Sequence, residues 1–230
     1  MKEKSEKSRC LIIFVKYPEN GKVKSRLAGY LTNDTAANLY ENFVRDILAT
    51  AEKGPFEMRI YFDPEEKAKE IRALLGEKYA YAVQRGQNLG EKMKNAFLQE
   101  FNAGCENVVL IGSDCPDLPV HILEKSFLCL ENQGLPVIGP ALDGGYYLIG
   151  FHKNNFCSDV FSGIQWSTSS VLERTMDILR TRNYKTEMLP IWRDVDTCDD
   201  LDFLIEKNRT TPFVRSNTIK FLKSNNLFPK

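Results

Sequence analysis

Histidine is scarce in this sequence, since the 230 residues include only His121 and His152. Mechanisms built on a catalytic histidine therefore have little material, and we expect His152 to be structural. The six cysteines never form a C-x-x-C pair, so their spacing does not indicate a zinc site, and reduced thiols in a cytoplasmic protein are the simplest interpretation. No apolar run is long enough to span a bilayer, and the charged start MKEKSEKSR lacks the apolar segment of a signal peptide.

An excess of charge of either sign is also missing. Lys+Arg and Asp+Glu both number 31, and the formal net charge is zero. Without a global field we expect neither nucleic acid nor a membrane surface as a partner. An anionic ligand would have to be attracted by a local cluster of basic side chains.

What the sequence does contain is an alternation of short apolar runs with segments of helical period. The runs predict strands at 10–15, 57–62, 79–84 and 107–112, and the periodic segments predict helices at 32–53, 64–76, 90–101 and 119–131. Strand and helix in regular order are typical of an α/β layered fold with a mostly parallel sheet.

After residue 135 the alternation changes. The Asp-Gly-Gly of PVIGPALDGGYYLIGF predicts a hairpin, followed by a helix at 168–182, a strand at 184–189 and a helix at 198–207. We therefore expect a tail at residues 1–9, one domain over 10–207, and a C-terminal extension of that domain at 208–230 for which no element is predicted.

Two aspartates follow the clearest strand, in GSDCPDLP. Ligands of α/β sheets gather at the carboxyl ends of strands, which is where Asp114 is expected, and its carboxylate suits a hard cation such as Mg²⁺ or Mn²⁺. An Asx-turn is the structural alternative for Asp114. Asp117 is as well explained as a cap of the helix beginning near Pro119.

A basic loop, KYPENGKVKSRLA, follows the first strand. It fits neither the Walker A pattern nor the G-x-G-x-x-G fingerprint. Its four cations at a strand's carboxyl end nevertheless suit a diphosphate, although a solvated basic turn is the simpler alternative. The residues are Lys16, Lys22, Lys24 and Arg26.

Five motifs in order, K-x-P-x-x-G-x-V-K-S-R-L-A, G-S-D-C-P-D-L, G-P-A-L-D-G-G-Y-Y-L-I-G, W-S-T and D-V-D-T-C-D-D-L, resemble one bacterial transferase family. This is the radical-SAM/selenodomain-associated family of the nucleotide-diphospho-sugar transferase (GT-A) superfamily. More distantly, the chain is similar to 2-phospholactate and molybdenum-cofactor guanylyltransferases. The resemblance implies a Rossmann-like, three-layer αβα GT-A fold with a mixed, mostly parallel sheet.

The resemblance also implies roles for individual residues. Metal ligation falls on Asp114 and on Asp196, with Asp194 as an alternative, while Thr197 or Asp196 also suits a helix cap. Phosphate binding falls on the basic loop, above all on Lys24 and Arg26, with Ser113 beside them. An acceptor pocket is expected around the residues Asp143, Gly144, Trp166 and Ser167.

Asp143 is a candidate general base or acceptor contact, and an ordinary Asp-Gly hairpin turn is its alternative. Thr168 equally suits a helix cap. In place of Lys16-Tyr17-Pro18 the sugar-nucleotidyltransferase consensus has two adjacent glycines. This departure favours a glycosyltransferase that uses a nucleotide sugar and an unknown small acceptor. Nucleotidyl transfer from a nucleoside triphosphate and a non-catalytic nucleotide-binding regulatory module remain the alternatives.

Overall fold

Strands and helices alternate along the part of the chain that the computed structural model describes, residues 8–27 and 30–227. The strands are β1 (Arg9–Lys16), β2 (Glu57–Asp63), β3 (Ala80–Val83), β4 (Asn107–Ile111), β5 (Val137–Pro140), β6 (Tyr146–His152) and β7 (Glu187–Met188). The helices are α1 (Asn33–Ala51), α2 (Ala68–Leu75), α3 (Leu89–Asn102), α4 (Val120–Gln133), α5 (Val171–Thr181), α6 (Cys198–Lys207) and α7 (Asn217–Ser224).

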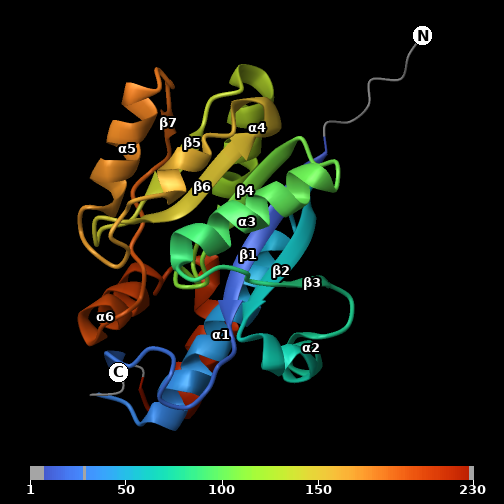
Figure 1. Cartoon of the computed structure of the whole chain (residues 1–230). Coiled ribbons are helices and arrows are strands. Elements are labelled where there is room, and N and C mark those ends of the chain that lie inside the picture. Colours follow the sequence, from blue (N-terminus) through green and yellow to red (C-terminus); the bar gives the residue numbers. More distant parts are fainter. Residues whose placement is uncertain (1–7, 28–29, 228–230) are drawn as a thin grey trace.

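The strands form one mixed sheet in the order β3-β2-β1-β4-β6-β5-β7 (Figure 1). Strand β6 runs antiparallel to β4 and β5, and the other neighbouring strands pair in parallel. The predicted α/β class with a mixed, mostly parallel sheet is confirmed. The loops after β1, β4 and β7 and the β5–β6 hairpin therefore meet at one edge of the sheet, which we call the carboxyl edge.

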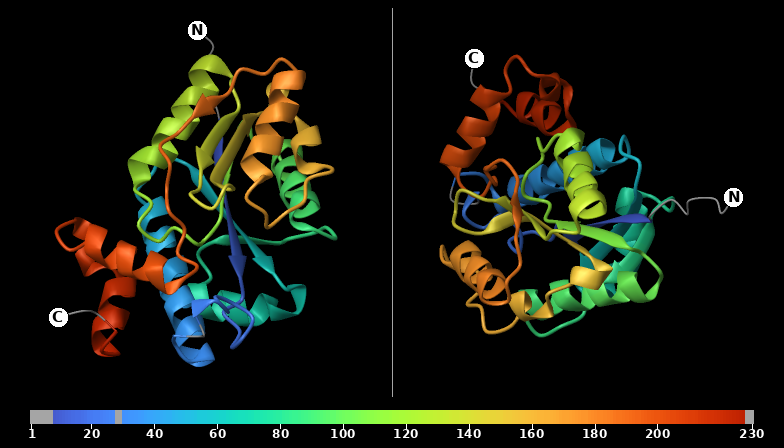
Figure 2. Two further views of the ribbon diagram at one scale, coloured as in Figure 1. Left: turned by 90° about the vertical axis from the view of Figure 1, so that its left-hand side faces the viewer. Right: turned by 90° about the horizontal axis from the view of Figure 1, so that it is seen from above.

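Alternation along β1 explains the layers on the two faces of the sheet. Leu11, Ile13 and Val15 join the buried residues of α1, α2 and α4, whereas Cys10, Ile12 and Phe14 join those of α3 and α5. The view from above in Figure 2 shows α4 and α3 on opposite faces. Every helix among the described residues is too short or too polar to cross a membrane.

The segment after residue 207, for which the sequence predicts no element, contains a 3₁₀ turn (Pro212–Arg215) and helix α7, which packs on α1. The buried carboxylate of Asp46 in α1 accepts hydrogen bonds from the backbone N–H groups of Asn217 and Thr218, both at 2.8 Å. A negative charge at the first turn of α7 satisfies donors that the helix cannot satisfy itself. This long-range contact fixes the position of α7.

Several predicted boundaries differ from those in the structure. The predicted helix at 168–182 begins only at Val171, and the Thr168 hydroxyl donates to the carbonyl of Gln165 instead of capping it. The strand predicted at 184–189 covers only two residues, Glu187–Met188. Of the tail expected at 1–9, residues 1–7 lie outside the described part, and Arg9 opens β1 with its guanidinium 2.6 Å from Glu131.

Candidate functional site

Lys24 joins the two aspartates that the sequence singles out as metal ligands. Its ammonium nitrogen lies 2.5 Å from Asp114 Oδ1 and 2.7 Å from Asp196 Oδ1. Asp114 comes from the loop after β4 and Asp196 from the segment between β7 and α6. Since one nitrogen contacts both carboxylates, two segments far apart in sequence lie within reach of a single cation.

The surroundings of Lys24 differ from those of a solvated basic turn. Its side chain is 3% exposed, and its φ of 49° lies in the left-handed region that non-glycine residues rarely adopt. Burial would lower the pKa of Lys24, but the charges of Asp114 and Asp196 outweigh it and hold the pKa above its ordinary value. Lys24 is therefore a buried cation paired with both carboxylates, and its contact with phosphate stays a prediction.

Backbone contacts hold the two acidic segments together. The N–H of Val195 donates to the carbonyl oxygen of Asp114 at 2.9 Å, which joins the segments directly. The Asp200 carboxylate accepts from the N–H groups of Asp196 and Thr197, and Thr197 caps α6 in a capping box with Asp200. The expected cap at Thr197 is confirmed, and its hydrogen bonds also orient the backbone of Asp196.

Two further aspartates add negative charge at the carboxyl edge. Burial, followed by the charges of Asp143 and Asp196, raises the pKa of Asp194 to about 6. The side chains of Asp114 and Asp196 remain 48% and 41% exposed. Lys24 thus holds one oxygen of each carboxylate, and both carboxylates still face solvent.

Tyr40, a residue of α1, contacts Ser113 and the backbone of Lys16 beside the site, and the sequence did not predict this role. Its hydroxyl lies 2.6 Å from Ser113 Oγ and accepts from the backbone N–H of Lys16 at 3.0 Å. Burial, followed by the charge of Asp114, raises the pKa of Tyr40 to about 12. Because the Ser113 side chain is buried and already paired, it faces Tyr40 and not the solvent. In the sequence Tyr40 is an aromatic residue on a predicted helix, and this pattern does not distinguish a site residue from a core residue.

The other predicted phosphate-binding residues are exposed. Lys16 ends β1 with its side chain in solvent, Lys22 lies 3.1 Å from Glu19, and Arg26 is exposed two residues after Lys24. The alanine that follows Leu27 in the K-S-R-L-A motif lies outside the described residues. The loop therefore presents cations beside the acidic pair, although their contact with phosphate stays a prediction.

The residues predicted to border an acceptor pocket lie along the β5–β6 hairpin and the segment before α5. Asp143 accepts the N–H of Gly145 at 2.8 Å, as an Asp-Gly turn requires, and remains exposed. Gly144 has a φ of 90°, and a Cβ there would meet the carbonyl oxygen of Ser169 at 2.1 Å. The hairpin is thus close to the segment that carries Trp166 and Ser167.

Trp166 and Ser167 differ in exposure. Trp166 is half-buried, and a Cβ on Gly90 at the start of α3 would lie 2.7 Å from its indole ring. Ser167 is exposed with a φ of 64°. Part of the Trp166 ring therefore fills the space beside Gly90, and its predicted acceptor contact remains a prediction.

Asp117 does not cap α4, contrary to the alternative drawn from the sequence. Helix α4 has no side-chain cap, and the Asp117 carboxylate, 2% exposed, accepts from Trp192 Nε1 at 2.8 Å and Asn208 Nδ2 at 2.9 Å. Lys207 Nζ lies 2.9 Å from it and 3.6 Å from the centre of the Trp192 ring. Asp117 therefore fastens the loop after β4 to the segments on both sides of α6.

This role predicts a large effect on stability. Replacing Asp117 by alanine removes the acceptor that Lys207, Trp192 and Asn208 share, so the free energy of unfolding should fall by about 3 kcal/mol. Urea denaturation followed by circular dichroism measures the change. Asp199→Asn, an exposed substitution in α6, is the control and should stay within about 0.5 kcal/mol. A loss of similar size in both variants would contradict the assigned role.

Comparison with known proteins identifies the family. The family model described as "uncharacterized protein conserved in bacteria (DUF2064)" matches residues 47–168, more than half of the chain. The chain belongs to the DUF2064 family. No curated protein matches it significantly.

Among solved structures, this DUF2064 chain is similar to a candidate nucleotide-diphospho-sugar transferase from Desulfovibrio desulfuricans G20. The two are 41% identical with a TM-score of 0.92, and the match covers 96% of each chain. Two more distant structures share the fold. A cytidylyltransferase from Leptospira borgpetersenii is 17% identical with a TM-score of 0.54, over 96% of each chain. Rv0371c from Mycobacterium tuberculosis, in complex with manganese, is 15% identical with a TM-score of 0.54, over 86% of this chain and 98% of its own.

Proposed function

We propose that this protein is a divalent-metal-dependent transferase that takes a glycosyl group from a nucleoside-diphosphate sugar. The observation that carries the proposal is the meeting of Asp114 and Asp196 on Lys24 at the carboxyl edge. The description of the Desulfovibrio relative as a candidate nucleotide-diphospho-sugar transferase supports the same substrate class.

The donor set fits Mg²⁺ or Mn²⁺. Asp114 and Asp196 offer only oxygen, which hard cations prefer, and both side chains are about half exposed. Asp143 and Asp194 lie close enough to add to the negative charge, whereas Lys24 is the cation buried between the pair. Rv0371c, which shares the fold, binds manganese. A bound divalent ion would offset the charge of the departing nucleoside diphosphate.

The chain's own residues supply the remaining parts of the reaction. Lys24 keeps the Asp114 and Asp196 carboxylates oriented, and the exposed Lys22 and Arg26 attract the diphosphate. In the transfer, an acceptor hydroxyl oxygen forms a bond to the anomeric carbon while the bond from that carbon to the phosphate oxygen breaks. The hydroxyl proton passes to Asp143, the exposed carboxylate of the hairpin.

Nucleotidyl transfer is the second candidate, and the fold shared with a cytidylyltransferase favours it. There an acceptor phosphate would attack the α-phosphorus of a nucleoside triphosphate, and pyrophosphate would leave. The same carboxylates and basic loop could serve either reaction, because each leaving group, a nucleoside diphosphate or pyrophosphate, contains a diphosphate.

Product analysis separates the candidates. The purified protein is incubated with Mn²⁺ and either nucleotide sugars or nucleoside triphosphates, each with a panel of acceptor alcohols and acceptor phosphates. We expect a nucleoside diphosphate to be released from a nucleotide sugar. Pyrophosphate released from a triphosphate in the presence of an acceptor phosphate would replace our proposal with nucleotidyl transfer. Metal-dependent binding without turnover on any substrate would indicate the non-catalytic regulatory module.

A further inference from the structure

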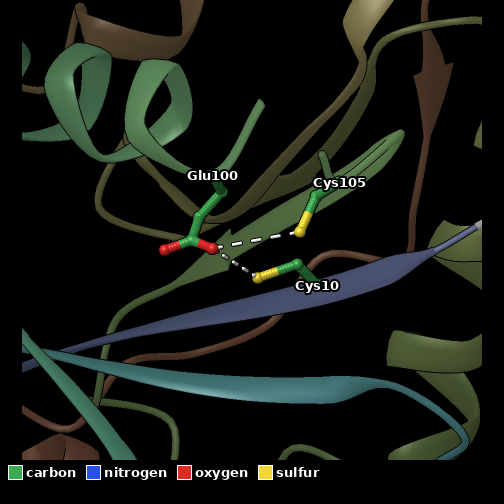
Figure 3. A group of neighbouring side chains, drawn as sticks. All are labelled: Cys10, Glu100 and Cys105. Carbon is green, nitrogen blue, oxygen red and sulfur yellow. Dashed lines mark hydrogen bonds between the residues drawn. The ribbon is translucent and has the colours of Figure 1, made fainter. Parts of the chain in front are cut away.

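Two thiols and a carboxylate meet at the edge of the sheet opposite the carboxyl edge. Cys10 lies near the start of β1, Glu100 in the last turn of α3, and Cys105 in the turn before β4. Figure 3 shows the three side chains pointing toward one another, with Cys10 Sγ 3.5 Å and Cys105 Sγ 3.9 Å from Glu100 Oε2. All three residues are buried, and their ligand atoms lie within 4.8 Å of one another.

We propose that Cys10, Glu100 and Cys105 form a structural metal site for a borderline-soft divalent cation, with Zn²⁺ as the preferred ion. Zinc binds thiolate sulphur at about 2.3 Å and carboxylate oxygen at about 2.0–2.2 Å, so sulphur and oxygen ligands of a tetrahedral ion lie about 3.5–3.7 Å apart. The two sulphur–oxygen distances here are close to that range before any ion is bound. Three of the four ligands of a tetrahedral site are therefore already arranged around a common centre.

The neighbours of Glu100 match the second shell of a metal site. Tyr61 donates its hydroxyl hydrogen to Glu100 Oε1 at 2.6 Å, which leaves Oε2 directed at the two sulphurs. Arg59 Nε lies 3.6 Å from Oε2. Two thiolates and one carboxylate carry three negative charges, of which Zn²⁺ offsets two, and Arg59, which also pairs with Glu57 at 2.6 Å, lies beside the third. Such outer partners orient the ligands and strengthen metal binding.

The location gives the site a structural role. Phe97 and Phe101 of α3 belong to the same apolar cluster as the two cysteines, so an ion here would lie within that cluster. The turn that carries Cys105 has exposed neighbours, which gives an ion and a solvent ligand a route to the fourth position. A bound ion would link β1, α3 and the start of β4, and its stabilisation would depend on metal concentration.

Cobalt substitution tests this site independently of the proposed function. The reduced, chelator-treated full chain is titrated with Co²⁺, and we expect one equivalent to give a near-ultraviolet thiolate-to-cobalt charge-transfer band. Asp114 and Asp196 offer only oxygen, so an ion bound there produces no such band. Zn²⁺ should abolish the band by competition and raise the melting temperature by about 5–10 °C.

Three variants locate the site. Cys105→Ser should lose the band, and Tyr61→Phe, which keeps every ligand, should weaken Co²⁺ binding by about 10- to 100-fold. Cys157→Ser, a buried cysteine of the same apolar cluster outside the cysteine–glutamate group, is the matched control and should bind like the unmodified chain. If the unmodified chain shows no band, or if Cys105→Ser retains it, the proposal fails. A mass of the untreated chain lower by two hydrogen atoms, with a disulfide between Cys10 and Cys105 and no metal uptake after its reduction, would identify a redox pair instead.

Discussion

Asp114→Asn is expected to abolish the metal dependence of nucleotide binding and to leave the fold intact. The substitution keeps the size of the side chain but removes the charge that both Lys24 and a divalent ion require. Replacing a residue that hydrogen-bonds to a metal ligand lowers the metal affinity by about 10- to 100-fold. Loss of a ligand itself should therefore lower the metal affinity by at least about 100-fold. Turnover should fall by about a thousandfold, since the leaving group loses its charge stabilisation.

Isothermal titration calorimetry with a nucleoside diphosphate, with and without Mn²⁺, measures the effect of Asp114→Asn. Asp199→Asn is the matched control, because it makes the same chemical change at an exposed position of the acidic motif that carries Asp196. Circular dichroism verifies the fold of both variants. If the Mn²⁺-dependent affinity of Asp114→Asn equals that of the unmodified chain, Asp114 does not belong to the site.

Lys24→Met should destabilise the protein most when divalent metal is absent. The substitution removes the one ammonium that contacts both Asp114 and Asp196 and leaves their charges to repel each other. Breaking a fully buried ion pair costs about 3–5 kcal/mol, and the half-exposed carboxylates here reduce this to about 2 kcal/mol in a chelating buffer. Saturating Mn²⁺ should restore much of that loss, because it replaces the missing positive charge.

Urea denaturation of Lys24→Met in chelator and in Mn²⁺ provides the comparison. Lys22→Met, which changes an exposed lysine of the same loop, should alter the free energy of unfolding by less than about 0.5 kcal/mol in either buffer. An equal loss for Lys24→Met with and without Mn²⁺ would show that the two carboxylates do not share a metal ion. Lys24 would then be a structural ion-pair residue.

The sequence predicted those parts of the fold that depend on local pattern. The continuous apolar run of β1 and the helical period of 32–53 predict buried side chains, and the structure confirms both elements. Because parallel strands end at the same edge, the position of Asp114 directly after β4 could be predicted to face other loops. The helix cap at Thr197 is also a local feature, and the sequence predicted it, although not the reciprocal bond from Asp200.

Long-range side-chain contacts could not be predicted in this way. Nothing in KYPENGKVKSRLA indicates that Lys24 is buried against Asp114 and Asp196, because that depends on how three loops pack. Asp117 resembled a helix cap because its partners, Trp192 and Asn208, lie much later in the chain. The spacing of Cys10 and Cys105 is uninformative for the same reason, since only the pairing of β1 with β4 brings them together.

The backbone bond from Val195 to Asp114 has a consequence for biosynthesis. Residues up to Ile111 complete four strands, so the ribosome can release most of the sheet while the acidic pair still lacks its second member. A nascent chain that ends before Asp196 contains Asp114 and Lys24 but lacks the second carboxylate that contacts Lys24. On the proposed function, nucleotide binding would require both acidic segments, so it would begin only late in translation, once the segment between β7 and α6 has docked.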